Sequence, residues 1–264
     1  MTLSVALANV ANTLVVSPGP TSNKIFVDAN GQVGFGASPS GWGNTAKGVD
    51  ITGNTYAFLN FNSTSSSNLT NNAYWDGTNW RYKTTGYTNA IGLTTAGSGG
   101  LQLYTAASGT AGNTVNFIVG MSIDPSGRVT KPNQPAFHVT AGAATTSGNT
   151  VTYTATVFDI GSNVNLGNGR FTAPVAGIYY VQYHQLAPNA NLGEYRMAIY
   201  KNGVTYGGLR WIAYKDTAST WQYLFAQGHV QCAAGDYITA VYELGPAALY
   251  TDANYGAFTG DLVG

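Results

Sequence analysis

The chain has 264 residues, which is enough for one large or two ordinary domains with ample core. Only 8% of the residues are charged, and 11 Lys and Arg balance 11 Asp and Glu. This composition provides neither the basic field that holds nucleic acid nor a polybasic segment for anionic lipid, so we expect no nucleic-acid partner and no membrane insertion.

Residues 1–23 are predicted to form an N-terminal attachment arm or a swapped strand, with a frayed terminus as the alternative. Leu3, Val5 and Leu7 alternate weakly, and the Ser-Pro-Gly-Pro run at residues 17–20 stops any regular element. The segment has no basic residue before Lys24, and polar residues interrupt its apolar run. It therefore resembles neither a secretory signal nor a membrane span.

Residues 24–131 are predicted to form a β-hairpin-rich shaft or adaptor domain. In "KIFVDANGQVGFG" two alternating runs flank a turn, and "MSIDPSGRVTKP" at residues 121–132 repeats the plan. The pairs Asp28/Asp124, Gly31/Gly127 and Val33/Val129 correspond. Between the two copies, short strands with Gly, Asn or Asp corners show no helical periodicity. Such hairpins bury little apolar surface alone and gain most by packing against copies of themselves.

Two prolines in "KPNQP", Pro132 and Pro135, predict a stiff connector to a C-terminal domain at residues 132–264. Residues 150–159, "TVTYTATVFD", alternate as one strand with a single buried face. In residues 169–186, "GRFTAPVAGIYYVQYHQL", two turns lead into an aromatic alternating strand, which we expect to be covered on both faces. Asn202-Gly203 marks a further hairpin tip.

Ordered sequence blocks in this region carry a family resemblance: "PAFHVT", "TVTYTATVFD", the stretch at residues 169–186, "MAIYKNG", "VQCAAGDYITAVYE" and "FTGDLV". They resemble the globular head of the complement-one-q family, the jelly-roll relatives of tumour necrosis factor. The resemblance implies an all-β, ten-strand antiparallel jelly-roll sandwich that assembles as a compact homotrimer and binds other molecules rather than transforming them. Leu166 and Asn168 depart from the family's pattern in one loop.

Several phrases of the first domain, including "VDANGQVGFG", "AYWDGTNWRY" and "MSIDPSGRV", resemble repeat modules of bacteriophage tail fibres. The resemblance implies a virion protein, made in the host cytoplasm and acting outside the cell. Its N-terminal segment would attach to a phage tail or capsid component, and its C-terminal knob would bind a host receptor for adsorption. A structural or decorating virion component without receptor recognition is the alternative.

Sequence motifs for catalysis and metal binding are absent. The three histidines, His138, His184 and His229, lack metal-ligand spacing, and no nucleophile elbow or phosphate loop occurs. We expect no enzyme activity and no cofactor, although a carboxylate pair for glycoside cleavage stays open. The resemblance to the complement-one-q head implies that calcium is the one ion to retain, because relatives of this head sometimes hold it in loops. Its oxygen ligands would come from Asp216, Asp252 or Asn254, and solvated loop acids are the alternative. Cys232 is predicted to be a buried small residue.

Two aromatic loops, at residues 207–223 and 249–256, are the candidate receptor surface because they combine rings with planar polar groups. Glycan recognition needs both: a ring for the apolar face of a sugar and polar groups for its hydroxyls. The same rings are also typical anchors between protomers, or for a protein receptor. The candidates are Arg210, Trp211, Tyr214, Lys215, Asp216, Tyr250, Asp252 and Tyr255.

Overall fold

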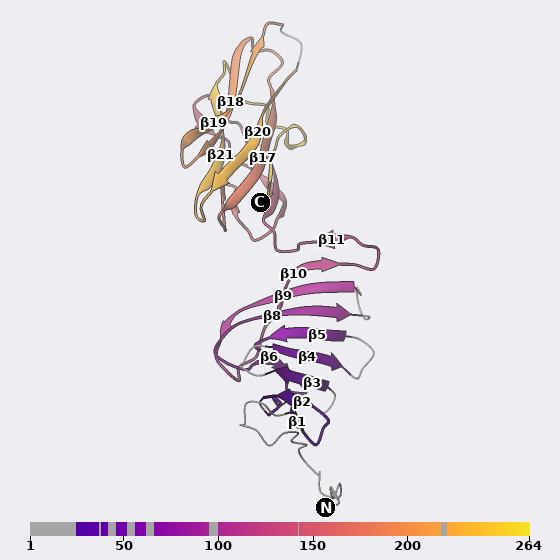
Figure 1. Cartoon of the computed structure of the whole chain (residues 1–264). Coiled ribbons are helices and arrows are strands. Elements are labelled where there is room, and N and C mark those ends of the chain that lie inside the picture. Colours follow the sequence, from indigo (N-terminus) through magenta and orange to yellow (C-terminus); the bar gives the residue numbers. More distant parts are fainter. Residues whose placement is uncertain are drawn as a thin grey trace, which may run out of the picture. The chain divides into compact units, whose positions relative to one another are not determined.

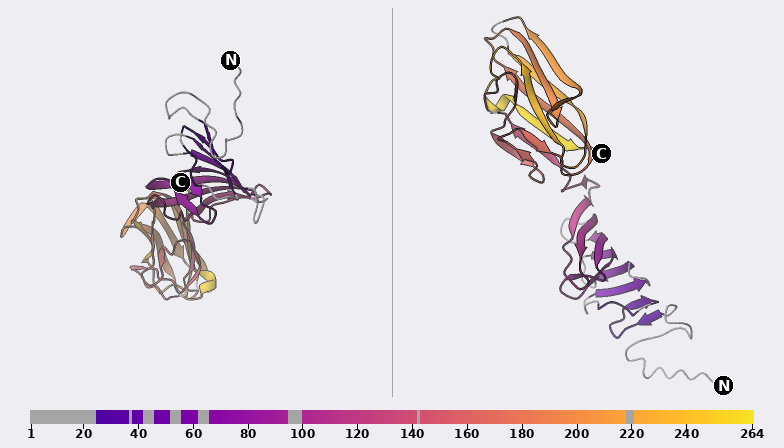
Figure 2. Two further views of the ribbon diagram at one scale, coloured as in Figure 1. Left: turned by 90° about the horizontal axis from the view of Figure 1, so that it is seen from below. Right: turned by 90° about the vertical axis from the view of Figure 1, so that its left-hand side faces the viewer.

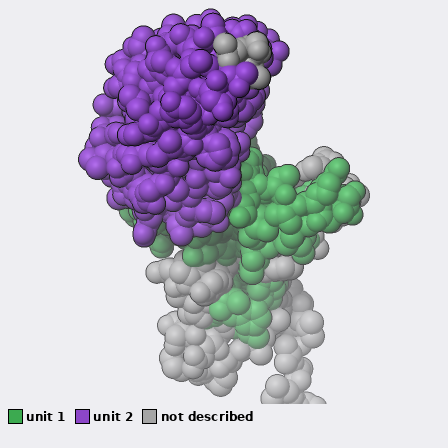
Figure 3. All heavy atoms as spheres, turned by 90° about the horizontal axis from the view of Figure 1, so that it is seen from above, with its two compact units in different colours: residues 1–132 green, residues 133–264 purple. Residues whose placement is uncertain are grey.

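The computed structural model describes residues 25–36, 38–41, 46–51, 56–61, 66–94, 100–141, 143–217 and 221–264. The chain divides into two compact units, residues 1–132 and 133–264, which are coloured separately in Figure 3. The described residues confirm the all-β prediction, since the one described helical element is a short 3-10 turn, η3 (Ala253–Tyr255). No helix in these ranges is both long and apolar enough to cross a membrane. The predicted attachment arm at residues 1–23 lies outside the described residues.

The first unit is dominated by one nine-stranded sheet, with β2 and β3 parallel and every other neighbouring pair antiparallel (Figure 1). A separate hairpin joins β6 (Ala73–Trp75) to β7 (Trp80–Tyr82). The strands of the large sheet, in spatial order, are β1 (Ile25–Val27), β2 (Val33–Phe35), β3 (Ala46–Ile51), β4 (Tyr56–Phe61), β5 (Ser66–Asn71), β8 (Gly86–Thr94), β9 (Gly100–Gly109), β10 (Ile118–Ile123) and β11 (Val129–Thr130).

The predicted repeat of one hairpin within this unit is confirmed down to its hydrogen bonds. Asp28 Oδ1 accepts from the backbone N–H groups of Asn30 and Gln32, both at 2.9 Å. Asp124 Oδ1 accepts from the backbone N–H groups of Ser126 and Arg128, which are two and four residues further along, again at 2.9 Å. Gly31 and Gly127 take φ values of 72° and 79°, where a side chain would be strained. The aspartate fixes each turn and the glycine makes it possible, so the sequence pattern alone predicts the geometry.

The second unit is a sandwich of two antiparallel sheets (Figures 1 and 2). The five-stranded sheet has the order β14 (Ala155–Asp159), β12 (Ala136–Thr140), β22 (Ala257–Leu262), β17 (Gly177–Ala187), β20 (Gln222–Cys232). The six-stranded sheet has the order β15 (Val164–Asn165), β16 (Arg170–Thr172), β21 (Tyr237–Leu244), β18 (Gly193–Lys201), β19 (Val204–Lys215), with β13 (Asn149–Thr150) paired to β21. The sandwich therefore has eleven strands, one more than the ten that the family resemblance implies, and the short β13 is among them. The tip at Asn202-Gly203 is confirmed, since both residues have positive φ.

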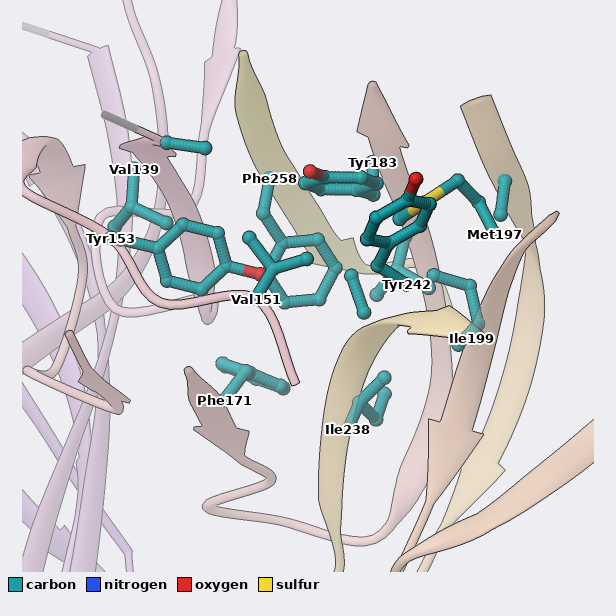
Figure 4. Close-up of a cluster of buried hydrophobic side chains, with 14 of the residues drawn as sticks. Val139, Val151, Tyr153, Phe171, Tyr183, Met197, Ile199, Ile238, Tyr242 and Phe258 are labelled. Atoms are coloured by element: carbon teal, nitrogen blue, oxygen red, sulfur yellow. The ribbon is translucent and has the colours of Figure 1, made fainter. Parts of the chain in front are cut away.

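The core of this unit lies between the two sheets. From β17, the side chains of Tyr179, Val181 and Tyr183 are fully buried in one apolar cluster. Figure 4 shows Tyr183 in this cluster together with Met197 of β18 and Tyr242 of β21. The alternation of residues along β17 therefore predicts its inner face correctly. The same cluster includes Cys232, which is 3% exposed as predicted, and burial raises the pKa of its thiol.

The prediction of one continuous strand over residues 150–159 is wrong. Val151 and Tyr153 are buried between the sheets, but Val157 is 59% exposed. The segment changes sheets, because Val151 N–H donates to Ala240 of the six-stranded sheet, and Thr154 N–H donates to Thr140 of the five-stranded sheet. The alternation of apolar and polar residues cannot reveal this crossing, because the crossing depends on hydrogen-bond partners in two different sheets.

Candidate functional site

The outward side of the five-stranded sheet carries all three histidines of the chain. His138 on β12 pairs with Thr259 on β22, which pairs with Gln182 on β17, and Gln182 pairs with Gln227 on β20. Residues directly opposite each other in a sheet point to the same side. We call this side the outer sheet face, and it consists of His138, Phe158, Ile178, Tyr180, Gln182, His184, Tyr223, Phe225, Gln227, His229, Gln231, Thr259 and one carboxylate, Asp261.

The outer sheet face is incompletely covered in a single chain. Ile178 is 42% exposed, Tyr223 is 45% exposed and Phe158 is 46% exposed, whereas Tyr180 and His184 are half-buried. For the single chain, the prediction that β17 is covered on both faces is therefore wrong. Large apolar and aromatic residues side by side on an exposed sheet are typical of an interaction surface.

Each histidine of this face lies against an aromatic ring on a neighbouring strand. The ring centroids are 6.0 Å apart for His138 and Phe158, 5.5 Å for His184 and Tyr223, and 5.3 Å for His229 and Tyr180. These contacts orient the imidazoles across the sheet instead of toward a common centre. The described residues contain no group of three or more His, Cys, Asp or Glu side chains that could hold a metal ion.

A shallow depression lies toward the β20 edge of the outer sheet face. Its volume is about 420 Å³, and it is lined by Gln182, His184, Tyr223, Phe225 and Gln227. The lining consists of aromatic rings, one imidazole and two neutral amides, and it contains no carboxylate, ammonium or guanidinium group. Such a lining fits a side chain of another protein better than it fits a charged ligand.

Acidification is expected to destabilise the second unit through His184. Burial lowers the pKa of His184, and the nearby His138 lowers it further, so the folded state favours the neutral imidazole. The phenol of Tyr223 is the other titratable group that contacts this ring. Above an unfolded-state pKa of about 6.5 the stabilisation is fully present, and it is lost as the pH falls from there toward the lower folded pKa. Thermal melts between about pH 7.5 and about pH 5 would measure this effect. As the pH falls, the melting temperature of His184→Gln should decrease less than that of the wild type. Equal slopes would contradict this assignment.

A second exposed aromatic group, which we call the ring cluster, consists of Trp221, Tyr250 and Tyr255. The ring centroids of Trp221 and Tyr250 are 4.8 Å apart, and those of Tyr250 and Tyr255 are 6.1 Å apart. Trp221 is 47% exposed and Tyr255 is 44% exposed. Trp221 and Tyr250 meet edge to face, and the rings of Tyr250 and Tyr255 are tilted by 53°, so each exposed ring can offer its own face to an apolar ligand.

The fold fixes the backbone beneath the ring cluster. Tyr250 N–H donates to Leu186 O at 3.1 Å, and Gln185 Nε2 donates to Tyr250 O at 2.6 Å. Asp252 caps the 3-10 turn that carries Tyr255, because its Oδ1 accepts from the backbone N–H of Asn254 at 2.9 Å. The ring cluster is thus preorganised by contacts to β17 and by its own turn.

Only part of the predicted receptor surface gathers at this place. Tyr250, Asp252 and Tyr255 lie together on the segment between β21 and β22, as their closeness in sequence suggests. The remaining predicted candidates, Arg210, Trp211, Tyr214, Lys215 and Asp216, belong to β19 and the residue that follows it. Among these, Tyr214 is 74% exposed and stays available for contact.

The structure removes Lys215 from the candidate surface. Its side chain is buried, and its Nζ donates to the carbonyl oxygens of Pro188, at 2.9 Å, and Asn189. Arg210 is engaged as well, with its Nε 2.6 Å from Glu243 Oε2. Trp211 stacks on Phe225 with centroids 4.1 Å apart. These side chains hold β19 to its neighbours, which the composition of the strand does not reveal.

Two of the predicted calcium ligands, Asp252 and Asn254, belong to the cap of one turn. Asp252 and Asn254 bond to each other, since Asn254 N and Nδ2 both donate to Asp252 Oδ1 at 2.9 Å. Asp216 accepts from Thr217 Oγ1 at 3.1 Å. A turn cap explains the first pair without an ion.

A family model matches most of the second unit. Residues 136–263 match the family model of the C1q domain. Residues 136–263 form a C1q/TNF-like domain. The sequence blocks that suggested this relationship therefore lie on strands of the expected jelly roll. Because the match begins at Ala136, the C1q/TNF-like domain begins with β12.

Solved structures that resemble part of this chain include a complement protein and a TNF-family protein. The globular domain of zebrafish complement 1qA protein is 18% identical, with a TM-score of 0.42, and the match covers 50% of this chain and 98% of that one. Murine APRIL, crystallised at pH 5.0, is 15% identical, with a TM-score of 0.42, and the match covers 49% and 99%. No curated protein matches the chain. The assignment of residues 136–263 to a C1q/TNF-like domain therefore rests on the family model.

The sequence analysis missed two residues of the exposed aromatic surfaces of the C1q/TNF-like domain. Trp221 belongs to the ring cluster, and Tyr223 belongs to the outer sheet face. Both occur in the stretch singled out for its aromatic content. The alternation of Tyr223, Phe225 and Gln227 along one strand was the available signal, because it places all three on one side.

Proposed function

We propose that this protein is the homotrimeric fibre or spike of a bacteriophage, and that its C1q/TNF-like domain binds a glycan on the host cell surface. C1q/TNF-like domains typically form homotrimers, bind ligands and are not enzymes. The first unit would serve as shaft or adaptor, and the N-terminal segment would attach to a tail or capsid component. Short sequence segments in the first unit that resemble repeat modules of phage tail fibres support these roles.

The outer sheet face is the proposed contact between the three heads. It presents exposed apolar and aromatic side chains beside neutral amides, such as Ile178, Phe158 and Gln182. Three copies around a common axis would remove this surface from water, which is the main driving force of association. The depression next to Tyr223 would accept a side chain of the neighbouring copy.

The ring cluster is the observation that carries the proposed binding activity. Trp221 and Tyr255 remain exposed although the turn beneath them is held by hydrogen bonds, and Asp252 places carboxylate oxygen beside the rings. A ring can cover the C–H face of a sugar while polar groups bind its hydroxyls. Three identical weak sites on one head would gain avidity if the host surface allows simultaneous contact.

Glycan binding can be tested with the full-length protein on an immobilised array of bacterial surface polysaccharides. We expect Trp221→Ala and Tyr255→Ala each to weaken the wild-type signal roughly 5- to 30-fold, because central aromatic anchors each contribute about 1–2 kcal/mol. Val204→Ala on β19, where Val204 is 67% exposed, is the control and should bind as the wild type does. Light scattering must show equal masses for all four proteins.

A structural or decorating virion component is the second candidate. It is favoured by the aromatic character of the ring cluster, since such rings also serve as contacts between protomers. In that case Trp221→Ala would lower the mass of the assembly, and the array would give no signal that depends on Trp221 or Tyr255.

A further inference from the structure

The nine-stranded sheet of the first unit has an apolar side that a single chain leaves exposed. Six large apolar side chains on this side are between 38% and 55% exposed. We call this side the apolar face and define it by these six residues: Leu69, Ile91, Leu93, Leu103, Ile118 and Val129.

The register shows that these residues form continuous rows instead of scattered positions. In one row Leu69 pairs with Ile91, which pairs with Leu103. In the next row Leu93 continues, through strands β9 and β10, to Val129. Paired residues share a side of the sheet, so the first row crosses three strands and the second crosses four.

The opposite side of the same sheet is the buried one, although it is largely polar. Asn68, Thr70 and Thr88 are at most 8% exposed, and Thr70 Oγ1 donates to Ala73 O at 2.9 Å. A small core at the β6–β7 hairpin covers this side, where Tyr82 packs with Ala106. A sheet with one wet side normally buries its apolar side and exposes its polar side. Here the arrangement is inverted, so the apolar face lacks its partner surface in the single chain.

Charge and chain connection both favour copies of the same chain as that partner. No charged residue occurs in strands β5, β8, β9, β10 and β11, so two apolar faces can meet without electrostatic repulsion. The face also has no charged group that could form an ion pair with a different protein and so favour that protein as the partner. Five residues separate Thr130, the end of β11, from Ala136, the start of β12. They span at most about 18 Å, so assembly of three heads holds three apolar faces at high effective concentration.

We propose that the apolar face is the contact between copies of this chain, so that three nine-stranded sheets enclose a shared apolar interior and form the shaft. This inference rests on the proposed homotrimer and extends it to a second, separate interface. Each sheet keeps its own polar side and its hairpin outward. The shaft is then stable only as an assembly, because its main apolar surface has no cover within one copy.

Residue-specific cross-linking in the full-length protein tests the contact. Leu103→Cys places a thiol in the middle of the apolar face, Ser108→Cys places one at the exposed end of the same strand, and the native Cys232 is buried. With a short bis-maleimide, we expect Leu103→Cys to form covalent links between copies, and Ser108→Cys to form few. Adding Leu93→Asp should lower the Leu103→Cys yield at least about tenfold, because it puts a charge into the apolar interior. Ser108→Asp should leave that yield unchanged.

The failure of this inference can be separated from failure of the proposed homotrimer. A protein that light scattering shows to be trimeric, but whose Leu103→Cys variant forms no link between copies, would overturn the shaft contact alone. Links within one chain would overturn it too, because they would show that another segment of the same chain covers the apolar face. A wild type that is monomeric at micromolar concentration would overturn both proposals.

Discussion

Phe137→Ala is expected to lower the free energy of unfolding of the C1q/TNF-like domain by about 3–5 kcal/mol. Phe137 is 1% exposed and stacks on Phe171 with ring centroids 4.6 Å apart. It also meets Phe258 edge-on at 4.9 Å. Its ring covers Gly260, where an added Cβ would come within 2.7 Å of Phe137 Cε1. Neighbours that are packed this closely cannot collapse into the cavity that the substitution leaves.

Urea unfolding of the full-length protein, followed through the transition of the second unit, would measure this loss. Tyr255→Ala is the control, because its ring is 44% exposed and its removal should change stability by no more than about 0.5 kcal/mol. A loss below about 1 kcal/mol for Phe137→Ala would show that the core closes over the gap, and it would contradict the packing described here.

Gln182→Glu is expected to dissociate the proposed homotrimer while leaving each subunit folded. Gln182 lies in the middle of the outer sheet face, paired with Thr259 on one side and Gln227 on the other. The replacement keeps the shape and adds one negative charge per copy. Three carboxylates taken out of water near a common axis, without cations, should weaken assembly at least about 100-fold, the equivalent of about 3 kcal/mol.

Sedimentation equilibrium over a range of concentrations would measure this change. Asn168→Asp adds the same charge to an exposed loop beside the other sheet, and Asp can keep the acceptor oxygen that receives Arg170 N–H. This control should assemble as the wild type does. If Gln182→Glu assembled with an unchanged constant, the outer sheet face would not be the contact between heads.

Much of the fold could be predicted from the sequence because the signals are local. The alternation of Tyr179, Val181 and Tyr183 indicates one buried side of a strand, since side chains alternate across it. Asp and Gly at fixed offsets specify the two equivalent turns at Asp28 and Asp124, because their hydrogen bonds span only a few residues. The ordered blocks also indicated the C1q/TNF-like domain, because they fall within the residues that match its family model or directly beside them.

What the sequence by itself determined was the β-class, the turns and the C1q/TNF-like relationship. Only the tertiary structure decided which sides of the sheets are covered. It placed three histidines distant in sequence on one side, set Trp221 against Tyr250, and buried Lys215. It also revealed that the first unit buries polar Thr70 and exposes apolar Leu93. Long-range strand pairing decides these features, and the free energy of such pairing depends on partners that no local pattern names.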